Sequence, residues 1–322
     1  MRLTNVARMA IPQGRLLSYA VLPVGERGRP LPVSFDQGRH VGRGQRSGSW
    51  MAISARLPSG TTLDDLAAAW FAVVQRHGTL RTAFSHSADG VLQLHEIEVG
   101  PGEWTEQPVH HDAREVVRRL FDQACAPFAV PSHRLVVALP ASPEPDPRPL
   151  VIVGADHSHV DMWSFLIVLR DLFTCLADLR AGRPQGRALP AAASFAEHSA
   201  ALEARPPAPP EVHRRWSEIL DAEGGVMPLF PLPLGDPNFP GESIVDVRDL
   251  LDPGQAARFA ELAAAEGVRT ISLALSVMTS ATDRVWRWLS ARAWAANARR
   301  SASVRERNAR CHCGSRVCVR NA

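Results

Sequence analysis

The stretch VIVGADHSHVDMWSF, from Val151 to Phe165, gathers side chains that can do chemistry. His157, His159 and Asp161 follow one another as H-x-H-x-D directly after an apolar run. An imidazole with a pKa near ~6.5 takes up and returns a proton at neutral pH, and it is also a common metal ligand. Two chemistries are therefore open here: a three-ligand metal site, or proton transfer through one histidine.

The metal interpretation needs more ligands than the sequence offers. Two histidines that are two residues apart on an irregular loop can reach one zinc ion. The pattern resembles the H-x-H-x-D-H of metallo-β-lactamase-like hydrolases, but Met162 stands where that family has a further histidine. His198 lies in a predicted helix and His213 follows a Pro-rich linker. A metallo-hydrolase stays the weaker alternative, and we predict neither a resident metal nor a bound cofactor.

The elements around this stretch can be read from apolar periodicity. PLVIVGAD is apolar throughout, as expected of a strand buried on both faces, and an apolar-faced helix follows Asp161. A second clear helix begins at a cap at Thr61 or Thr62 and ends near His77-Gly78, with Gly78 able to take the left-handed conformation. Further strands are expected at Gly14–Val24, Ser49–Pro58, Thr79–Phe84 and Val91–Val99, and a helix at Ala113–Ala126.

A second motif lies where that capped helix meets the next strand. RHGTLRTAF resembles the R-H-x-x-L-R-T-x-F of the condensation-domain superfamily, and the matching residues are Arg76, His77, Leu80, Arg81, Thr82 and Phe84. The superfamily also carries H-H-x-x-x-D-G-W-S. Aligning DMWS with D-G-W-S makes His157 its second, catalytic histidine, and the other motif residues become Asp161, Trp163 and Ser164. Asp156 then replaces the first histidine, Met162 replaces the glycine, and His159 falls on a variable position.

Further stretches look like one branch of this superfamily, the actinobacterial polyketide-associated (Pap-type) acyltransferases. They are PVSFDQGRHVG…GSWMAISARLP, DHSHVDMWS and GGVMPLFPLPLGD. The resemblance covers roughly residues 15–283. It implies an α/β fold, an α+β two-layer sandwich, with a chloramphenicol-acetyltransferase-like half at residues 1–203 and a linker plus the start of a second such half at 204–283. The later pieces of that half are not recognisable, so we expect a shortened chain with weak or no activity and low solubility.

The resemblance also implies a reaction and its partners. The family moves an acyl group from a thioester co-substrate, either CoA or carrier-protein phosphopantetheine, to a hydroxyl or an amine in lipid or polyketide-type assembly. An acyl carrier protein or a polyketide synthase would be the donor, and a small-molecule or lipid hydroxyl the acceptor. A non-catalytic condensation-like interaction module is the alternative.

The resemblance assigns roles to the motif residues. His157, at a tunnel midpoint, is the general base or else orients the acceptor. Asp161 is structural, as a partner of Arg81, as the helix N-cap, or as both. For Arg76 and Arg81, ordinary surface charge is the alternative, and Trp163 is expected in the core or the tunnel wall. If the family needs glycine at position 162 for an unusual backbone angle or for room near the thioester, methionine there costs activity or narrows the substrate channel.

Composition limits the remaining classes. The net charge is +3, every basic residue is Arg, and the arginines are scattered before the tail, so no nucleic-acid surface is expected. We expect a reduced, cytoplasmic protein without a membrane span, while peripheral membrane association stays open. Residues 284–322 carry ten of the arginines and three of the five cysteines. An out-of-frame or disordered tail, a metal knuckle at Cys311, His312, Cys313 and Cys318, and a binding tail are the alternatives.

Overall fold

The computed structural model describes residues 4–141, 146–222, 224–226 and 248–281. The chain divides into two compact units, Met1–Pro206 and Pro207–Ala322. The motif residues all lie in the first unit. The tail from residue 284 onward, with its cysteines, lies outside the described residues.

The first unit is built on a five-stranded sheet in which all neighbouring strands are antiparallel. The strand order is β3-β8-β7-β1-β6. The bounds are β1 Gly14–Val24, β3 Trp50–Arg56, β6 Glu98–Gln107, β7 His133–Pro140 and β8 Leu150–Asp156. This mixed α/β architecture with an antiparallel sheet confirms the predicted fold class.

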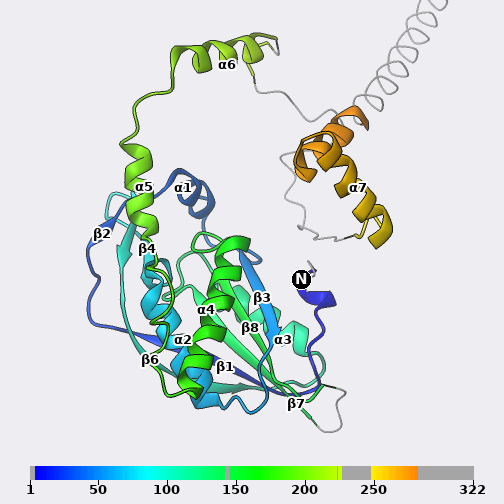
Figure 1. The fold of residues 1–322 in the computed structure, drawn as a ribbon. Helices are drawn as coiled ribbons and strands as arrows, with labels where there is room; N and C mark the ends of the chain where they lie inside the picture. The colour runs from blue at the N-terminus through cyan, green and yellow to red at the C-terminus, as the bar shows by residue number, and fades with distance from the viewer. Residues whose placement is uncertain (1–3, 142–145, 223, 227–247, 282–322) are drawn as a thin grey trace, which may run out of the picture. The chain divides into compact units, whose positions relative to one another are not determined.

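Helices cover both faces of this sheet (Figure 1). The helices α2 (Leu63–Arg76) and α4 (Met162–Arg180) pack against each other on one face, and α3 (Ala113–Ala124) lies on the other. Along β8, Val151 and Val153 enter the α2/α4 core, while Ile152 faces α3. A Cβ at Gly154 would lie 2.8 Å from the Phe121 ring, so glycine makes room for α3. The strand that precedes His157 is therefore fixed from both sides.

A small second sheet and two capped helices complete the surroundings of the site. Its strand order is β2-β5-β4, with β2 Pro30–Leu31, β4 Thr82–His86 and β5 Leu92–Glu96. The helix α1 (Phe35–Val41) begins with a capping box made by Ser34 and Gln37, and α2 begins with one made by Thr62 and Asp65. After α2 the chain makes the 3₁₀ turn η2 (Gly78–Arg81), and Gly78 does not adopt the left-handed conformation that we expected.

Short elements make up the rest of the described chain. The first unit also contains η1 (Val6–Arg8) and α5 (Phe195–Glu203). The second contains α6 (Pro210–Ala222), α7 (Pro253–Ala265) and a helix over 270–281. The sequence also predicts a strand near Ser243–Leu250, and most of that stretch lies outside the described residues. Within the described residues no single helix is long and apolar enough to cross a membrane; α7 and the helix after it meet the criterion only together, across a bend of 100°.

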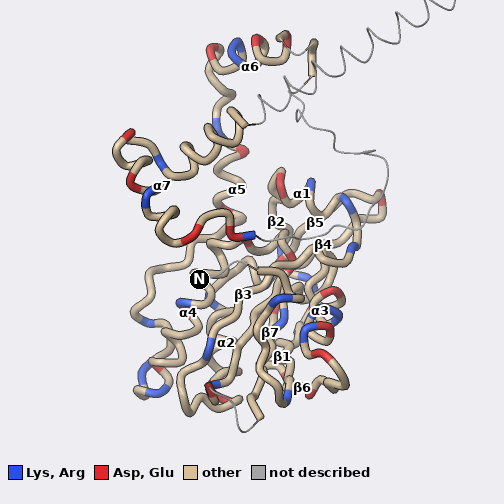
Figure 2. The backbone as a smooth tube through the Cα atoms, turned by 90° about the vertical axis from the view of Figure 1, so that its right-hand side faces the viewer, with Lys and Arg blue, Asp and Glu red and all other residues tan. Residues whose placement is uncertain are grey.

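Charged residues of both signs are mixed along the first unit (Figure 2). Arg15 forms an exposed ion pair with Glu106, and Arg29 forms one with Glu96. Such pairs contribute little to stability, since water screens them. Buried charges are screened much less.

Candidate active site

The loop between β8 and α4, residues 157–161, carries the H-x-H-x-D motif, and three other elements hold it. The backbone N–H of His157 donates to the Ser49 carbonyl at 3.0 Å, at the start of β3. The Gln37 side-chain amide on α1 donates to the Ser158 carbonyl at 3.0 Å. The Thr79 hydroxyl in η2 lies 3.3 Å from the His159 carbonyl that accepts its hydrogen bond. The loop shape is therefore set by contacts distant in sequence.

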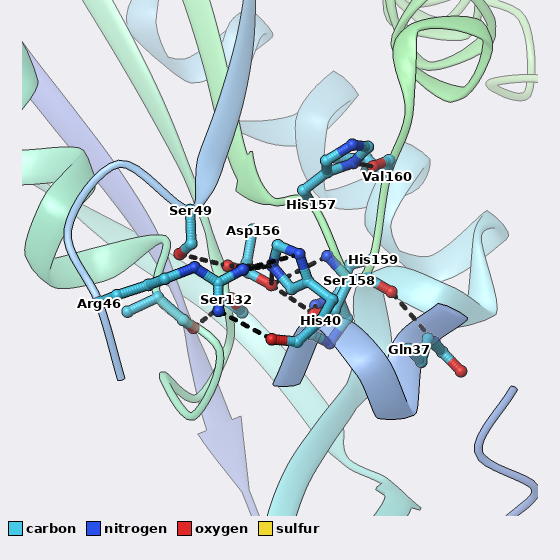
Figure 3. Close-up of polar contacts among 11 residues, drawn as sticks. Gln37, His40, Arg46, Ser49, Ser132, Asp156, His157, Ser158, His159 and Val160 are labelled. Carbon is cyan, nitrogen blue, oxygen red and sulfur yellow. Dashed lines mark hydrogen bonds and ion pairs between the residues drawn. The ribbon is translucent and has the colours of Figure 1, made fainter. Parts of the chain in front are cut away.

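The ring of His157 is exposed, and one of its nitrogens is already used. Nδ1 lies 2.8 Å from the Val160 carbonyl oxygen (Figure 3). A carbonyl only accepts hydrogen bonds, so Nδ1 carries the hydrogen and Nε2 keeps its lone pair. The imidazole is thereby presented as a proton acceptor through Nε2.

His157 lines a cavity of about 820 Å³. That volume falls in the range of small-molecule sites, roughly 300–1,000 Å³. The lining includes His40 and Gln37 of α1, Arg76 and His77 at the end of α2, and Ser164 and Ile167 of α4. Both sequence motifs therefore face one space, although they are about 80 residues apart in the chain.

Asp156, which stands where the superfamily motif has its first histidine, is fully buried. Its carboxylate accepts hydrogen bonds from the Ser49 hydroxyl at 2.6 Å, from the Ser158 N–H at 2.9 Å and from the Ser158 hydroxyl. His40 Nε2 lies 3.3 Å from its Oδ1 and 3.5 Å from its Oδ2 (Figure 3). A carboxylate has about four lone-pair sites, so these donors satisfy it completely.

Asp161 is the N-cap of α4. Its Oδ1 accepts from the Ser164 N–H at 2.7 Å and from the Ser164 hydroxyl at 2.6 Å. These bonds, with the backbone contact and the nearby His157, lower the pKa of the Asp161 carboxyl. The expected ion pair with Arg81 is wrong: within the described part of the chain Asp161 forms none with it. Donors on its own turn satisfy the carboxylate, and Arg81 Nε is buried without a hydrogen-bond partner there.

Two expectations for the start of α4 are corrected. Trp163 does not pack in the core, because 74% of its surface is exposed. The buried face of α4 begins at Phe165 and continues through Val168 and Leu172, and Trp163 lies off that face. Met162 is the first residue of α4, and no described residue other than glycine has a positive φ. Methionine at position 162 therefore carries no backbone strain.

Arg76 and His77 of the second motif converge on Asp171 of α4, whose side chain is fully buried. Arg76 Nε and His77 Nε2 each lie 2.9 Å from Asp171 Oδ2, and Arg170 Nη2 lies 2.7 Å from Oδ1. Burial raises the pKa of Asp171, but the hydrogen bonds from Arg170, Arg76 and His77 outweigh it, so the pKa is lowered. Arg76 is thus part of a buried network that joins α2 to α4, and the surface-charge alternative does not hold for it.

His159 is only 7% exposed, so its ring is not accessible as a free base. Its Nδ1 lies 3.0 Å from the Ser158 hydroxyl, and its ring packs edge-on against Phe84 with 5.4 Å between centroids. Burial lowers its pKa. No three His, Cys, Asp or Glu side chains in the described ranges are arranged to hold a metal ion, so the geometry gives the H-x-H-x-D metal interpretation no support.

Sequence reasoning missed two residues of this site, His40 and Asp171. His40 lies inside PVSFDQGRHVG, a stretch that carried the resemblance, and the Ser34/Gln37 capping pattern could have placed it on a short helix. Asp171 had no such signal, since an acidic residue within an amphipathic helix is ordinary.

Comparisons with known proteins bear on the family resemblance and the fold. No family model matches the chain. It is 27% identical over 267 residues to "Acyltransferase PapA3" of Mycobacterium tuberculosis, an alignment that covers 75% of this chain and 52% of that protein. It is 28% identical over 172 residues, or 49% of this chain, to "Nonribosomal peptide synthetase agiA" of Aspergillus flavus, and this alignment covers 2% of the synthetase. The chain thus spans about half the length of the PapA3 relatives it matches.

Solved structures share the fold. The structure of "PapA2 acyl transferase" superposes with a TM-score of 0.65 at 21% identity, over 83% of this chain and 60% of that one. The condensation domain from the Monacolin K polyketide synthase MokA gives a TM-score of 0.51 at 18% identity, over 81% of this chain and 60% of that one. At such low identity these two matches establish the architecture and leave the reaction open.

Proposed function

We propose that this chain, which is similar to Pap-type acyltransferases of the condensation-domain superfamily, transfers an acyl group from a thioester to a hydroxyl or an amine. The thioester is that of CoA or of a carrier-protein phosphopantetheine. The observation that carries the proposal is His157, whose Nδ1 is tied to Val160 while its ring lines the cavity.

The proposed reaction uses the lone pair that this tautomer of His157 leaves on Nε2. Nε2 of His157 takes the proton of the acceptor hydroxyl, and the oxygen attacks the thioester carbonyl carbon. The C–S bond then breaks, and the thiolate that leaves takes the proton back from Nε2 as a thiol. Proton transfer of this kind typically contributes about 10²–10⁴-fold to the rate. In a variant of this proposal, Nε2 orients the acceptor hydroxyl without taking its proton, and the contribution to the rate is smaller.

The partners belong to the same proposal. An acyl carrier protein or a polyketide synthase supplies the acyl group, and a small-molecule or lipid hydroxyl receives it. The cavity volume of about 820 Å³ is large enough for a pantetheine arm and an acyl chain together with an acceptor group. Assembly of lipid- or polyketide-type esters is the pathway class that fits, and the site of action is the cytoplasm or its membrane surface.

The test uses the full chain with acetyl-, octanoyl- and palmitoyl-CoA and with alcohols of increasing length. Ester formation is followed by mass spectrometry and thiol release by absorbance. We expect transfer with at least one pair, and a loss of about 10²–10⁴-fold in His157→Ala. His110→Gln, an exposed histidine outside the cavity, is the matched control. Unchanged ester formation in His157→Ala would remove His157 from its role, and thioester binding without any ester product would favour the non-catalytic module.

A further inference from the structure

A second imidazole stands beside His157 in the same cavity wall. The ring centroids of His40 and His157 are 5.7 Å apart, with 75° between the ring planes. His40 comes from α1, more than a hundred residues before the loop. It reaches Asp156, the residue that replaces the first histidine of the motif (Figure 3).

Both nitrogens of His40 are engaged. Nε2 lies 3.3 Å from Asp156 Oδ1, and Nδ1 lies 2.9 Å from Arg46 Nη2. Arg46 Nη1 also donates to the His40 carbonyl at 2.8 Å. Arg46 Nη2 also lies 3.2 Å from Nε2, so Asp156 distinguishes the two nitrogens. Its carboxylate only accepts, so the hydrogen is on Nε2, and the lone pair of Nδ1 faces Arg46 Nη2 at the shorter distance. This assignment makes the ring neutral and leaves it no free lone pair.

Resting on the proposed function, we propose that His40 is a positioning residue for His157. It supplies from α1 the imidazole that position 156 lacks. It locks the buried Asp156 carboxylate next to the His157 loop, and it keeps an uncharged ring at the place where His157 must carry a proton during transfer.

Electrostatics supports an uncharged His40. Burial lowers the pKa of His40, Arg46 and His157 lower it further, and Asp156 opposes the shift. The other charged or titratable groups around the two rings are Asp36 on α1, His159 in the loop, Asp161 at the start of α4, and the Arg76, His77 and Asp171 network across the cavity. A proton on His157 would be repelled by a charged neighbour at this separation, so a neutral His40 favours proton uptake by His157.

Three substitutions of His40 separate its possible roles. His40→Gln keeps a donor for Asp156 and an acceptor for Arg46 without a titratable ring. His40→Leu removes both contacts. His40→Lys places a permanent positive charge beside His157. The pKa of His157 is measured from the imidazole Cε1–H signals of ¹³C-labelled protein, assigned with His157→Ala, and near-UV circular dichroism checks the fold.

We expect His40→Lys to lower the pKa of His157 by roughly 0.5–2 units, from Coulomb repulsion at this separation with an effective dielectric constant between about 80 and 20. His40→Gln leaves that pKa nearly unchanged, because the amide is as uncharged as the neutral ring that it replaces. His157→Ala raises the pKa of His40, because His157 contributes to lowering it. In turnover, His40→Leu lowers kcat on the order of ten- to a hundredfold with little change in KM, and His40→Gln restores most of the loss.

The proposal is overturned if a folded His40→Lys protein has the wild-type pKa at His157, or if His40→Leu turns over at the wild-type kcat. Titration does not require turnover. If the titrations of His40 and His157 are coupled but the protein forms no ester, the proposed function is contradicted. The electrostatic effect of His40 on His157 is then still supported. His110→Gln, as the control, is expected to change neither reading.

Discussion

At the residue scale, His40, His157 and His159, three of the histidines that line the cavity, differ in the contacts of their ring nitrogens. His157 gives Nδ1 to Val160 and keeps Nε2. His40 uses both nitrogens, on Arg46 and Asp156. His159 is buried against Phe84. Under the proposed function, the same side chain serves as a base, a positioning group and a packing group within one small region, and the surrounding contacts decide which.

The N-cap role of Asp161 predicts how substitutions affect stability. Asp161→Ala removes the acceptor for the Ser164 N–H and is expected to cost about 1 kcal/mol in the free energy of unfolding, within the usual range of roughly 0.5–2 kcal/mol. Asp161→Asn keeps a capping oxygen and should retain most of that free energy. Urea unfolding at neutral pH measures both. Equal losses in the two variants would mean that the negative charge, and not the cap, is what matters.

At the element scale, the relation between α2 and α4 depends on one carboxylate. Asp171 is fully buried, and the end of α2 reaches it through Arg76 and His77. The motif R-H-x-x-L-R-T thus ends a helix in a way that fixes that helix against α4, and the 3₁₀ turn after it carries Thr79 to the His157 loop.

Removing this carboxylate should be far more costly than removing an exposed one. Asp171→Ala leaves the buried side of Arg76 uncompensated and is expected to lower the free energy of unfolding by about 3–5 kcal/mol. Glu106→Ala breaks the exposed pair with Arg15 and should change it much less. Chemical denaturation of both variants gives the comparison, and similar losses would contradict the description of Asp171 as a buried anchor.

At the scale of the whole molecule, the sequence predicted what is local and repetitive. The cap at Thr61 or Thr62, the apolar run of β8 and the spacing along α4 each lie within one element. These elements were found where expected, and Thr62 is the cap that α2 uses. The contacts that make the site are not local. His40 and Asp156 are 116 residues apart, and Arg76 and Asp171 are 95 apart. No periodicity encodes such pairs, so the sequence placed His157 and missed its neighbours.

Global stability should fall on mild acidification, because burial disfavours the charged form of several histidines, including His133, His77 and His159. Burial lowers the pKa of His133 to about 3 and also lowers those of His77 and His159. Below the ordinary value of 6.5 the unfolded chain binds protons that the folded chain does not. The free energy of unfolding therefore decreases as the pH falls from about 6.5 toward 3, by up to about 1.4 kcal/mol per pH unit for each such group.

His133→Leu tests the largest of these contributions. It removes the bond from Nε2 to the Leu80 carbonyl, so the variant starts less stable at neutral pH. Its free energy of unfolding should nevertheless fall less steeply between about pH 6.5 and pH 4, by roughly 1.4 kcal/mol per pH unit. Urea unfolding across that range gives both slopes, and parallel curves would show that His133 titrates normally in the folded protein.

The described contacts that hold the His157 loop come from α1, η2, β3, β8 and α4, all of which belong to the unit that ends at Pro206. Which nitrogen of His157 is left free is thus set, among the described residues, by the folding of the first unit. Under the proposed function, proton handling and the choice of acyl acceptor can therefore be altered by substitutions in different parts of the chain.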